Sequence, residues 1–201
     1  MNAYINGLIK VAIVGFVACT FADVSAYEVA THAELTSSAF NRSILAQQDF
    51  VETLGISAGA KFDESRADSG RPIVNDGTVE GWLRQGAVKE DGFGCTDTRP
   101  TNHFFDPAND RPLTYLFRTW GLRSPDWALE DQQDAEGQEY SLKDALDRFH
   151  EAMSLPEKEG RDRSFGLLFQ TLGHVMHHVQ DMAQPEHVRN DRHRVTQGAH
   201  V

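Results

Sequence analysis

Residues 173–187 carry the densest group of potential metal-binding side chains, in the order Gly-His-Val-Met-His-His-Val-Gln-Asp-Met-Ala-Gln-Pro-Glu-His. His177 and Asp181 are four residues apart, so in a helix they lie on one face, one turn from each other. An imidazole nitrogen and a carboxylate oxygen at that spacing can share a zinc ion, with bonds of about 2.0 to 2.2 Å. Pro185 ends the helix, and the turn that follows can return His187 to the same pocket.

The residues before this segment predict the helix that would present these ligands. Apolar side chains recur there at the three-and-four spacing of one helical stripe, namely Phe165, Leu168, Phe169, Leu172, Met176, Val179 and Ala183. Gly173 lies one turn before His177, where a glycine costs about 1 kcal/mol relative to alanine and so indicates the close approach of another group. His174 and His178 crowd the same flank, which indicates burial on both sides. The alternative is a solvated, His-rich helix end.

The pattern Gly-x-x-x-His-x-x-x-Asp-x-x-Gln-Pro-x-His, present with one extra spacer, resembles the signature of the zinc-dependent phospholipase C and single-strand nuclease superfamily. In that family Pro precedes the last His by two residues and Asp precedes it by six, as in this chain. The resemblance implies that His177 and Asp181 bind one zinc of a three-metal cluster. It also implies that His187 begins a second site.

A second motif, His103-Phe104-Phe105-Asp106-Pro107, is similar to the phospholipase C branch of the family. The resemblance implies that His103 and an upstream aspartate complete the first zinc site. Asp91, twelve residues earlier, fits this role better than Asp97, because a separation of six residues is too tight. A histidine that only packs within a loop is the alternative for His103. Asp106 before a proline favours a turn in which its carboxylate binds backbone amides, a structural role.

The first residues have the shape of a signal peptide. Lys10 precedes an apolar run over residues 11–22, and Val24-Ser25-Ala26 forms a small-x-small cleavage site. The run is too short for a confident membrane span. We therefore expect export to the periplasm or the medium, with residues 1–26 removed. Lipid attachment at Cys19 is the competing fate, although the residues before it make a poor lipobox.

Cleavage after Ala26 would make Tyr27 the new amino terminus, five residues before His32. The resemblance implies that backbone atoms of Tyr27 bind a metal together with His32, although the family usually has Trp at this position. The alternative is that His32 only lies near the start of a helix over residues 33–48. Thr31 and Thr36 are both possible caps for that helix.

Composition and periodicity predict an all-α, multihelical single domain over residues 27–201. The chain has 201 residues, 40% of them hydrophobic, which suffices for one core. Helices are expected over 79–88, with Trp82, Leu83 and Val88 in the core, and over 142–153, capped by Ser141. The 142–153 helix would have Leu142, Ala145, Leu146, Phe149 and Met153 on one apolar stripe. A last long helix would have Pro156 in its first turn. Residues 111–134 are ambiguous in period.

These expectations combine into an exported, phospholipase C-like phosphodiesterase that uses up to three zinc ions. A zinc-bound hydroxide would attack phosphorus, with Asp91 orienting or deprotonating the water and Asp181 bridging two metals. A third zinc near Tyr27 and His32 would stabilise the leaving oxygen. We expect a phospholipid or another phosphodiester as substrate, with transient contact to a membrane surface. The net charge of −11 argues against stable nucleic-acid binding, although bound zinc would supply local positive charge.

The chain departs from the family pattern at its end. There the second zinc site should be completed by a further His and, four residues later, an acidic residue. His193 and His200 are present, but no acidic residue follows Asp191. We therefore expect a truncated form of a longer protein. A single-strand nuclease and a non-catalytic exported metal-binding protein are the alternative functions.

Overall fold

The computed structural model describes residues 29–56, 76–91, 98–129 and 138–190. These contain seven α-helices and one two-stranded antiparallel sheet, so the predicted helical class is confirmed. Among the described helices, none combines the length and the apolar character that a membrane span requires. The predicted features at positions 1–27, 97, 191, 193 and 200 lie outside the described residues.

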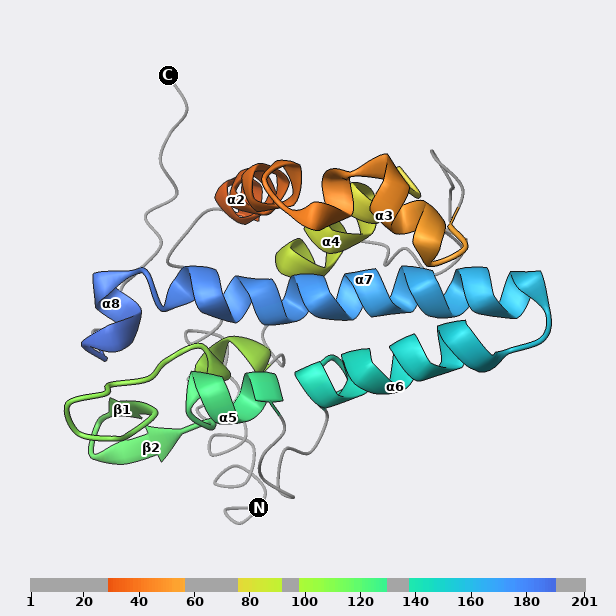
Figure 1. The fold of residues 1–201 in the computed structure, drawn as a ribbon. Coiled ribbons are helices and arrows are strands. Elements are labelled where there is room, and N and C mark those ends of the chain that lie inside the picture. Colours follow the sequence, from red (N-terminus) through yellow and green to blue (C-terminus); the bar gives the residue numbers. More distant parts are fainter. Residues whose placement is uncertain (1–28, 57–75, 92–97, 130–137, 191–201) are drawn as a thin grey trace, which may run out of the picture.

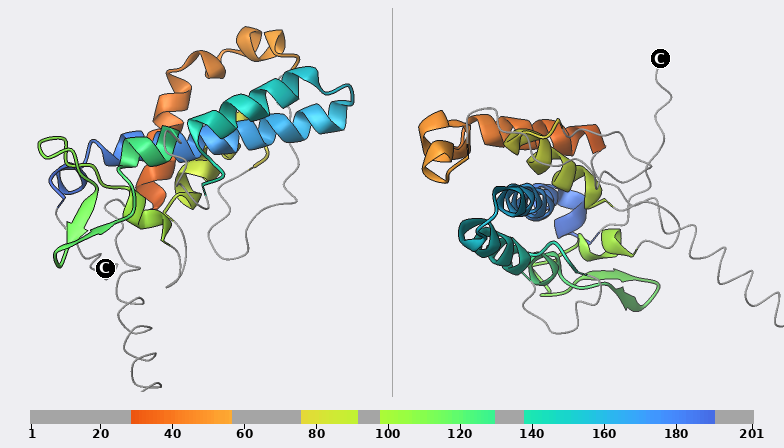
Figure 2. Two further views of the ribbon diagram at one scale, coloured as in Figure 1. Left: turned by 90° about the horizontal axis from the view of Figure 1, so that it is seen from below. Right: turned by 90° about the vertical axis from the view of Figure 1, so that its right-hand side faces the viewer.

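The longest helix, α7 (Lys158–Asp181), runs through the middle of the fold (Figure 1). On one side it packs against α4 (Val79–Lys89), which is itself covered by α2 (Val29–Asn41). On the other side lies α6 (Leu142–Ser154), and the end view in Figure 2 shows α7 between these layers. The main core contains buried side chains of α4, α6 and α7: Trp82, Leu83, Ala145, Ala152, Phe165, Leu168 and Phe169.

Two glycines allow the backbones of α4 and α7 to touch. A Cβ atom on Gly173 would lie 2.1 Å from the carbonyl oxygen of Leu83, and one on Gly86 would lie 1.9 Å from that of Gln170. Only glycine fits at both positions. The close approach predicted from Gly173 is therefore confirmed, and the group that approaches is the backbone of α4.

The helix starts follow the local sequence. Thr78 accepts a hydrogen bond from the Gly81 amide at the start of α4 (3.1 Å), and Ser141 forms a capping box with Asp144 at the start of α6. The predictions for residues 79–88 and for Ser141 are confirmed. The first residue of α7 is Lys158, so Pro156 precedes the helix instead of lying in its first turn.

The single helix predicted over residues 33–48 is wrong. The segment forms α2, a 3-10 turn (Ile44–Ala46) and the short helix α3 (Gln48–Thr53). Ser43 explains the break, because its hydroxyl donates to the Phe40 carbonyl (2.7 Å) and accepts from the Leu45 amide (3.1 Å). Thr31 and Thr36 lie inside α2, so neither precedes the helix as an N-cap residue would.

Two predicted apolar stripes are only partly buried. On α7, Val179 is 69% exposed and Ala183 is exposed beyond the helix end. On α6, Leu146, Phe149 and Met153 are 62%, 39% and 51% exposed. The contact between α6 and α7 uses the small side chains Ala145 and Ala152 of α6, which are 1% exposed, so the larger side chains stay on its flank.

The ambiguous segment after residue 111 contains a β-hairpin and a short helix, α5 (Ser124–Leu129). Strands β1 (Leu113–Tyr115) and β2 (Arg118–Trp120) pair with Tyr115 opposite Arg118, which leaves a two-residue turn. The turn residues Leu116 and Phe117 have φ angles of 50° and 62°. For side chains other than glycine this conformation costs roughly 1–2 kcal/mol per residue. Helix α8 (Pro185–Val188) follows α7.

Candidate metal centre

The structure brings six of the predicted ligands together from five parts of the chain. They come from α2, the end of α4, the loop after the 3-10 turn Arg99–Asn102, the end of α7, and α8. All six are buried, with 7% exposure or less: His32, Asp91, His103, His177, Asp181 and His187. Tyr27 and Asp97 lie outside the described residues.

The Asp181 carboxylate is at the centre of this group. Three ring nitrogens converge on its Oδ2: His103 Nδ1 at 3.0 Å, His177 Nε2 at 3.1 Å and His187 Nδ1 at 3.2 Å. Its other oxygen, Oδ1, lies 3.6 Å from His32 Nε2. Neither oxygen accepts a well-directed hydrogen bond in the described part of the chain. Ring nitrogens and a carboxylate oxygen this close together could share a metal ion.

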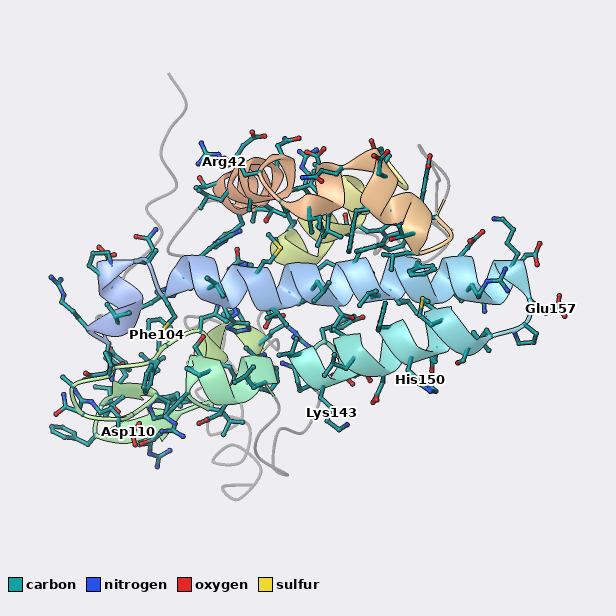
Figure 3. The ribbon with its side chains drawn as sticks, viewed as in Figure 1. Arg42, Phe104, Asp110, Lys143, His150 and Glu157 are labelled. Atoms are coloured by element: carbon teal, nitrogen blue, oxygen red, sulfur yellow. The ribbon has the colours of Figure 1, made fainter. Side chains whose placement is uncertain are left out.

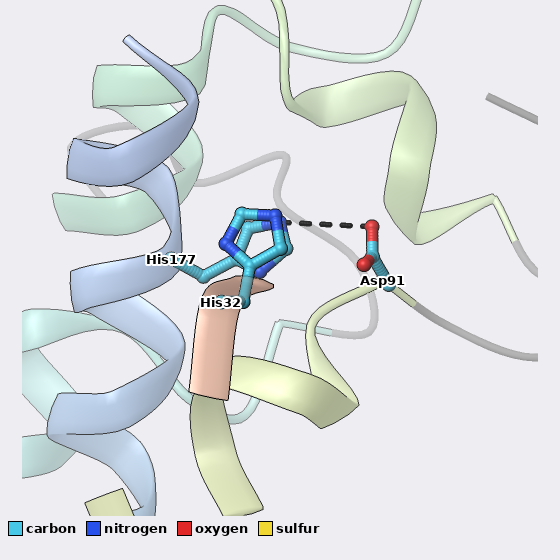
Figure 4. Close-up of side chains that lie close together, drawn as sticks. All are labelled: His32, Asp91 and His177. Carbon is cyan, nitrogen blue, oxygen red and sulfur yellow. Dashed lines mark ion pairs between the residues drawn. The ribbon is translucent and has the colours of Figure 1, made fainter. Parts of the chain in front are cut away.

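Asp91 lies beside the rings of His32 and His177 (Figure 4). Its Oδ1 is 3.7 Å from His177 Nε2, and the rings of His32 and His177 stack with centroids 3.8 Å apart. The donor atoms of His32, Asp91 and His177 all lie within 4.8 Å of one another, and so do those of His103, His177 and Asp181. The two donor groups share His177, whose Nε2 can bind one cation, so they outline overlapping positions and not two independent sites.

Hydrogen bonds on the far side of two rings fix which nitrogen faces the centre. His177 Nδ1 lies 2.7 Å from the Ala87 carbonyl oxygen, which can only accept, so Nδ1 carries the proton. Gln180 donates through Nε2 to Thr36 Oγ1 (2.9 Å), so its Oε1 accepts from His32 Nδ1 (2.6 Å). Both rings, when neutral, therefore direct the lone pair of Nε2 towards the cluster. Such outer hydrogen bonds orient metal-binding histidines.

Glu90 is a buried carboxylate that the sequence reasoning missed. It accepts hydrogen bonds from His174 Nδ1 (2.5 Å), His178 Nε2 (2.9 Å), Arg99 Nη1 (2.8 Å) and Trp127 Nε1 (2.9 Å). Glu90, His103 and His178 also form a group whose donor atoms lie within 4.8 Å of one another, and Glu90 Oε1 lies 3.7 Å from His103 Nε2. We do not assign a metal to Glu90, because these hydrogen bonds already engage both of its oxygens. It instead forms a second carboxylate layer behind His103.

The buried carboxylates and histidines of the candidate metal centre and of the Glu90 layer shift one another's pKa values. The pKa of Asp181 lies well below its ordinary value, because nearby His177 and His103 outweigh the cost of burial. Burial opposes a charged His103, but Asp181 and Glu90 raise its pKa to about 10. Burial together with His177 lowers the pKa of His32 to about 4, and burial lowers that of His174 to about 4. Burial also opposes a charged His177, but Asp181 and Asp91 raise its pKa. Without a metal ion, protonated His103 and His177 would partly offset the carboxylates, and a cation would replace those protons.

These residues could hold a metal ion. Both oxygens of Asp181 and Oδ2 of Asp91 are buried without a hydrogen bond in the described residues. A donor set of imidazoles and carboxylates without cysteine suits zinc in a hydrolytic role. His187 contacts Asp181, but the described residues contain no group of three donors that includes it. The second site expected at His187 therefore stays a prediction.

Asp106 has the structural role that its position before a proline predicts. Its Oδ1 accepts hydrogen bonds from the amides of Ala108 (3.1 Å) and Asn109 (3.3 Å), and its Oδ2 accepts one from Arg111 Nε (3.0 Å). These bonds fix the turn that follows the His103 loop.

Comparisons of this chain with protein-family models, with curated proteins and with solved structures found no match.

Proposed function

We propose that the protein is an exported, zinc-dependent phosphodiesterase of the phospholipase C-like type. One observation carries the proposal. Six residues that a family pattern singles out, spread from position 32 to position 187, have their side chains in one buried cluster in which four histidines face the Asp181 carboxylate. A solvated His-rich helix end would not bury these side chains, and His177 is 0% exposed.

In this proposal the chain holds the metal through atoms that already face one another. His177 Nε2, His103 Nδ1 and the carboxylates of Asp91 and Asp181 would hold a first zinc ion, and His32 Nε2 with Asp181 Oδ1 would contribute to a neighbouring one. Bound zinc supplies a Lewis acid for the phosphoryl oxygens and lowers the pKa of a water molecule.

The carboxylates have different tasks. Asp91 presents one oxygen, Oδ1, to His177, while Oδ2 has no hydrogen bond within the described residues and can accept a proton from an attacking water molecule. Asp181 lies between the ring nitrogens of His32 and His103, so its carboxylate would help to hold a cation bound by either ring. Glu90 holds His174 and His178 in place behind them.

A non-catalytic metal-binding protein is the second candidate, and the burial of the donors favours it. A catalytic metal keeps one coordination position open to substrate, whereas a structural metal is enclosed. All six donor residues are 7% exposed or less. The distinction is therefore made by activity and not by metal content alone.

The test measures zinc per chain in the full-length protein and in a His177→Ala/Asp181→Ala variant. The matched control is His150→Ala/Asp147→Ala, which removes the same residue types from the exposed face of α6 (Figure 3). We expect about two or three zinc ions in the parent and the control, and a sharp loss in the site variant. Hydrolysis of p-nitrophenyl phosphorylcholine should be lost with the zinc.

The other possible results of these zinc and hydrolysis measurements would support different conclusions. Zinc binding without hydrolysis of this ester, of bis(p-nitrophenyl) phosphate or of single-stranded DNA would favour the non-catalytic protein. Hydrolysis of single-stranded DNA alone would favour a nuclease. A parent protein without zinc would refute the metal centre.

A further inference from the structure

The turn of the β-hairpin presents two large apolar side chains to solvent. Leu116 is 63% exposed and Phe117 is fully exposed, at 104% of its reference area. We call these two residues the hairpin tip. They connect Tyr115 to Arg118, which are paired across the two strands. Single exposed apolar residues are common on protein surfaces, but two adjacent ones at the end of a projecting hairpin are not explained by the packing of the fold.

The sequence of the tip opposes the backbone conformation of the turn. Both residues have positive φ angles, 50° and 62°, as in a type I′ turn. Such turns prefer Asn-Gly, since these residues adopt positive φ at low cost. Leu and Phe at these positions are strained, and their exposed side chains gain little packing within the fold. Strain of this kind at an exposed apolar site points to a role outside the fold.

The charge around the tip is opposite to that of the chain. Residues 111–123 contain three arginines and no acidic residue, whereas the whole chain has a net charge of −11. Arg111 and Arg123 pair with aspartates at the base of the hairpin. Arg118, next to Phe117, is exposed and makes no ion pair with any described residue. The cation beside the apolar tip is thus available to a phosphate group.

The hairpin is fixed to the metal centre. Leu113 and Trp120 pack against Phe104, whose ring centroid lies 4.6 Å from that of His187. The Asn190 side chain, just after α8, accepts from the Thr114 amide (3.0 Å) and donates to the Pro112 carbonyl (3.0 Å). Figure 1 shows the hairpin and α8 at the same end of the molecule, and Phe104 lies between them in Figure 3.

We propose that the hairpin tip inserts Leu116 and Phe117 into the surface of a phospholipid bilayer while Arg118 contacts lipid phosphates. Apolar side chains, a neighbouring cation and an adjoining aromatic residue, here the half-buried Tyr115, are the combination that protein segments at a membrane interface use. The occupant is a lipid surface and not a protein groove, because a narrow convex tip inserts between lipids but buries little area against a protein. In combination with the proposed function, on which this last step rests, insertion would place the end of the molecule that carries the hairpin and α8 at the lipid surface (Figure 1).

The test measures co-sedimentation with phosphatidylcholine vesicles, in the presence of a chelator so that no lipid is hydrolysed. The variant Leu116→Asn/Phe117→Gly replaces the tip with the pair that a type I′ turn prefers, so it should fold at least as stably as the parent. The matched control is Leu146→Gln, which removes an equally exposed leucine, 62% against 63%, from α6. We expect the tip variant to lose about tenfold or more of its vesicle binding.

Three results would overturn the proposal. These are a parent protein that does not bind vesicles, equal binding by the parent and the tip variant, and an equal loss in the Leu146→Gln control. A parent dimer that the tip variant converts to monomer without lipid would assign the tip to a second copy of the chain, which also overturns it. Zinc content and hydrolysis of a soluble ester test the proposed function separately. If those fail while vesicle binding depends on the tip, the hairpin proposal stands and the enzyme proposal does not.

Discussion

Replacement of Gly173 by alanine tests whether the contact between α4 and α7 positions the metal centre. The new Cβ atom would meet the Leu83 carbonyl oxygen at 2.1 Å, whereas real Cβ contacts are not closer than 3.0 Å. The two helices must therefore separate by about 0.9 Å at this point. The carbonyl of Ala87, which orients His177, and Asp91 both belong to the α4 segment that would move.

The expected cost follows from two opposing effects. Alanine is the better helix former by about 1 kcal/mol, while overpacking in a tight contact costs about 1–3 kcal/mol and occasionally more. We expect a net loss of up to about 2 kcal/mol of unfolding free energy, which lowers the Tm by up to about 8 °C in a protein of this size. Because metal sites tolerate only about 0.2 Å of change in ligand distance, zinc affinity should fall by about 10- to 100-fold.

Gly160→Ala, in the first turns of the same helix, is the matched control. Its Cβ would meet only the end of the Leu155 side chain, at 3.3 Å, so this variant should gain stability by up to about 1 kcal/mol and keep its zinc affinity. Urea unfolding and competition with a zinc chelator measure both quantities. If Gly173→Ala stabilised the protein as much as Gly160→Ala, the close contact between α4 and α7 at Gly173 would be refuted. A destabilised Gly173→Ala with parental zinc affinity would refute the link between that contact and the metal centre.

Three further predictions concern the carboxylate layers and the helix caps. Glu90→Gln should cost about 3–5 kcal/mol in urea unfolding, because it removes the charge from a buried ion-pair network, and an unchanged stability would contradict the outer layer. In chelator, the free energy of unfolding should be greatest near pH 6.5. It should fall towards pH 4, because His32 and His174 take up protons in the unfolded chain that the folded protein excludes. It should also fall towards pH 10, because His103 loses the proton that the folded protein holds more tightly than the unfolded chain. Zinc should abolish the alkaline fall in urea titrations, since it replaces the His103 proton, and a fall that persists with zinc would count against His103 as a ligand. Ser141→Ala should cost about 1 kcal/mol through the lost cap of α6 and leave zinc content unchanged, which elemental analysis would check.

The parts of the fold that could be predicted from the sequence are those that depend on local periodicity and local hydrogen bonds. The helix over 79–88, the Ser141 cap and the turn role of Asp106 need only neighbouring residues to form, and all three are confirmed. Gly173 was also informative, because a glycine inside a strong helical pattern has few explanations other than a close contact.

The predictions from sequence were wrong where tertiary contacts or a single side chain determine the local structure. Ser43 interrupts a pattern that otherwise continues over residues 33–48, and nothing in the apolar spacing reveals the break. The stripe that includes Leu146 and Phe149 predicts burial, but α6 meets α7 through alanines that allow a closer contact. The hairpin was not predicted, since its Leu-Phe turn lacks the Asn-Gly signal.

Glu90 differs from these failures, because the sequence of α7 indicated that a buried carboxylate was needed. His174, His177, His178 and Asp181 follow one another at intervals of three, one and three residues, which is the spacing of a buried apolar stripe. Titratable side chains on such a stripe must find partners of opposite charge or polarity if they are buried. His177 and Asp181 account for the metal centre, so His174 and His178 require another carboxylate, and Glu90 next to Asp91 supplies it. The contact through Gly86 and Gly173 brings these carboxylates within reach of the stripe, so the glycines and the histidines work as one arrangement.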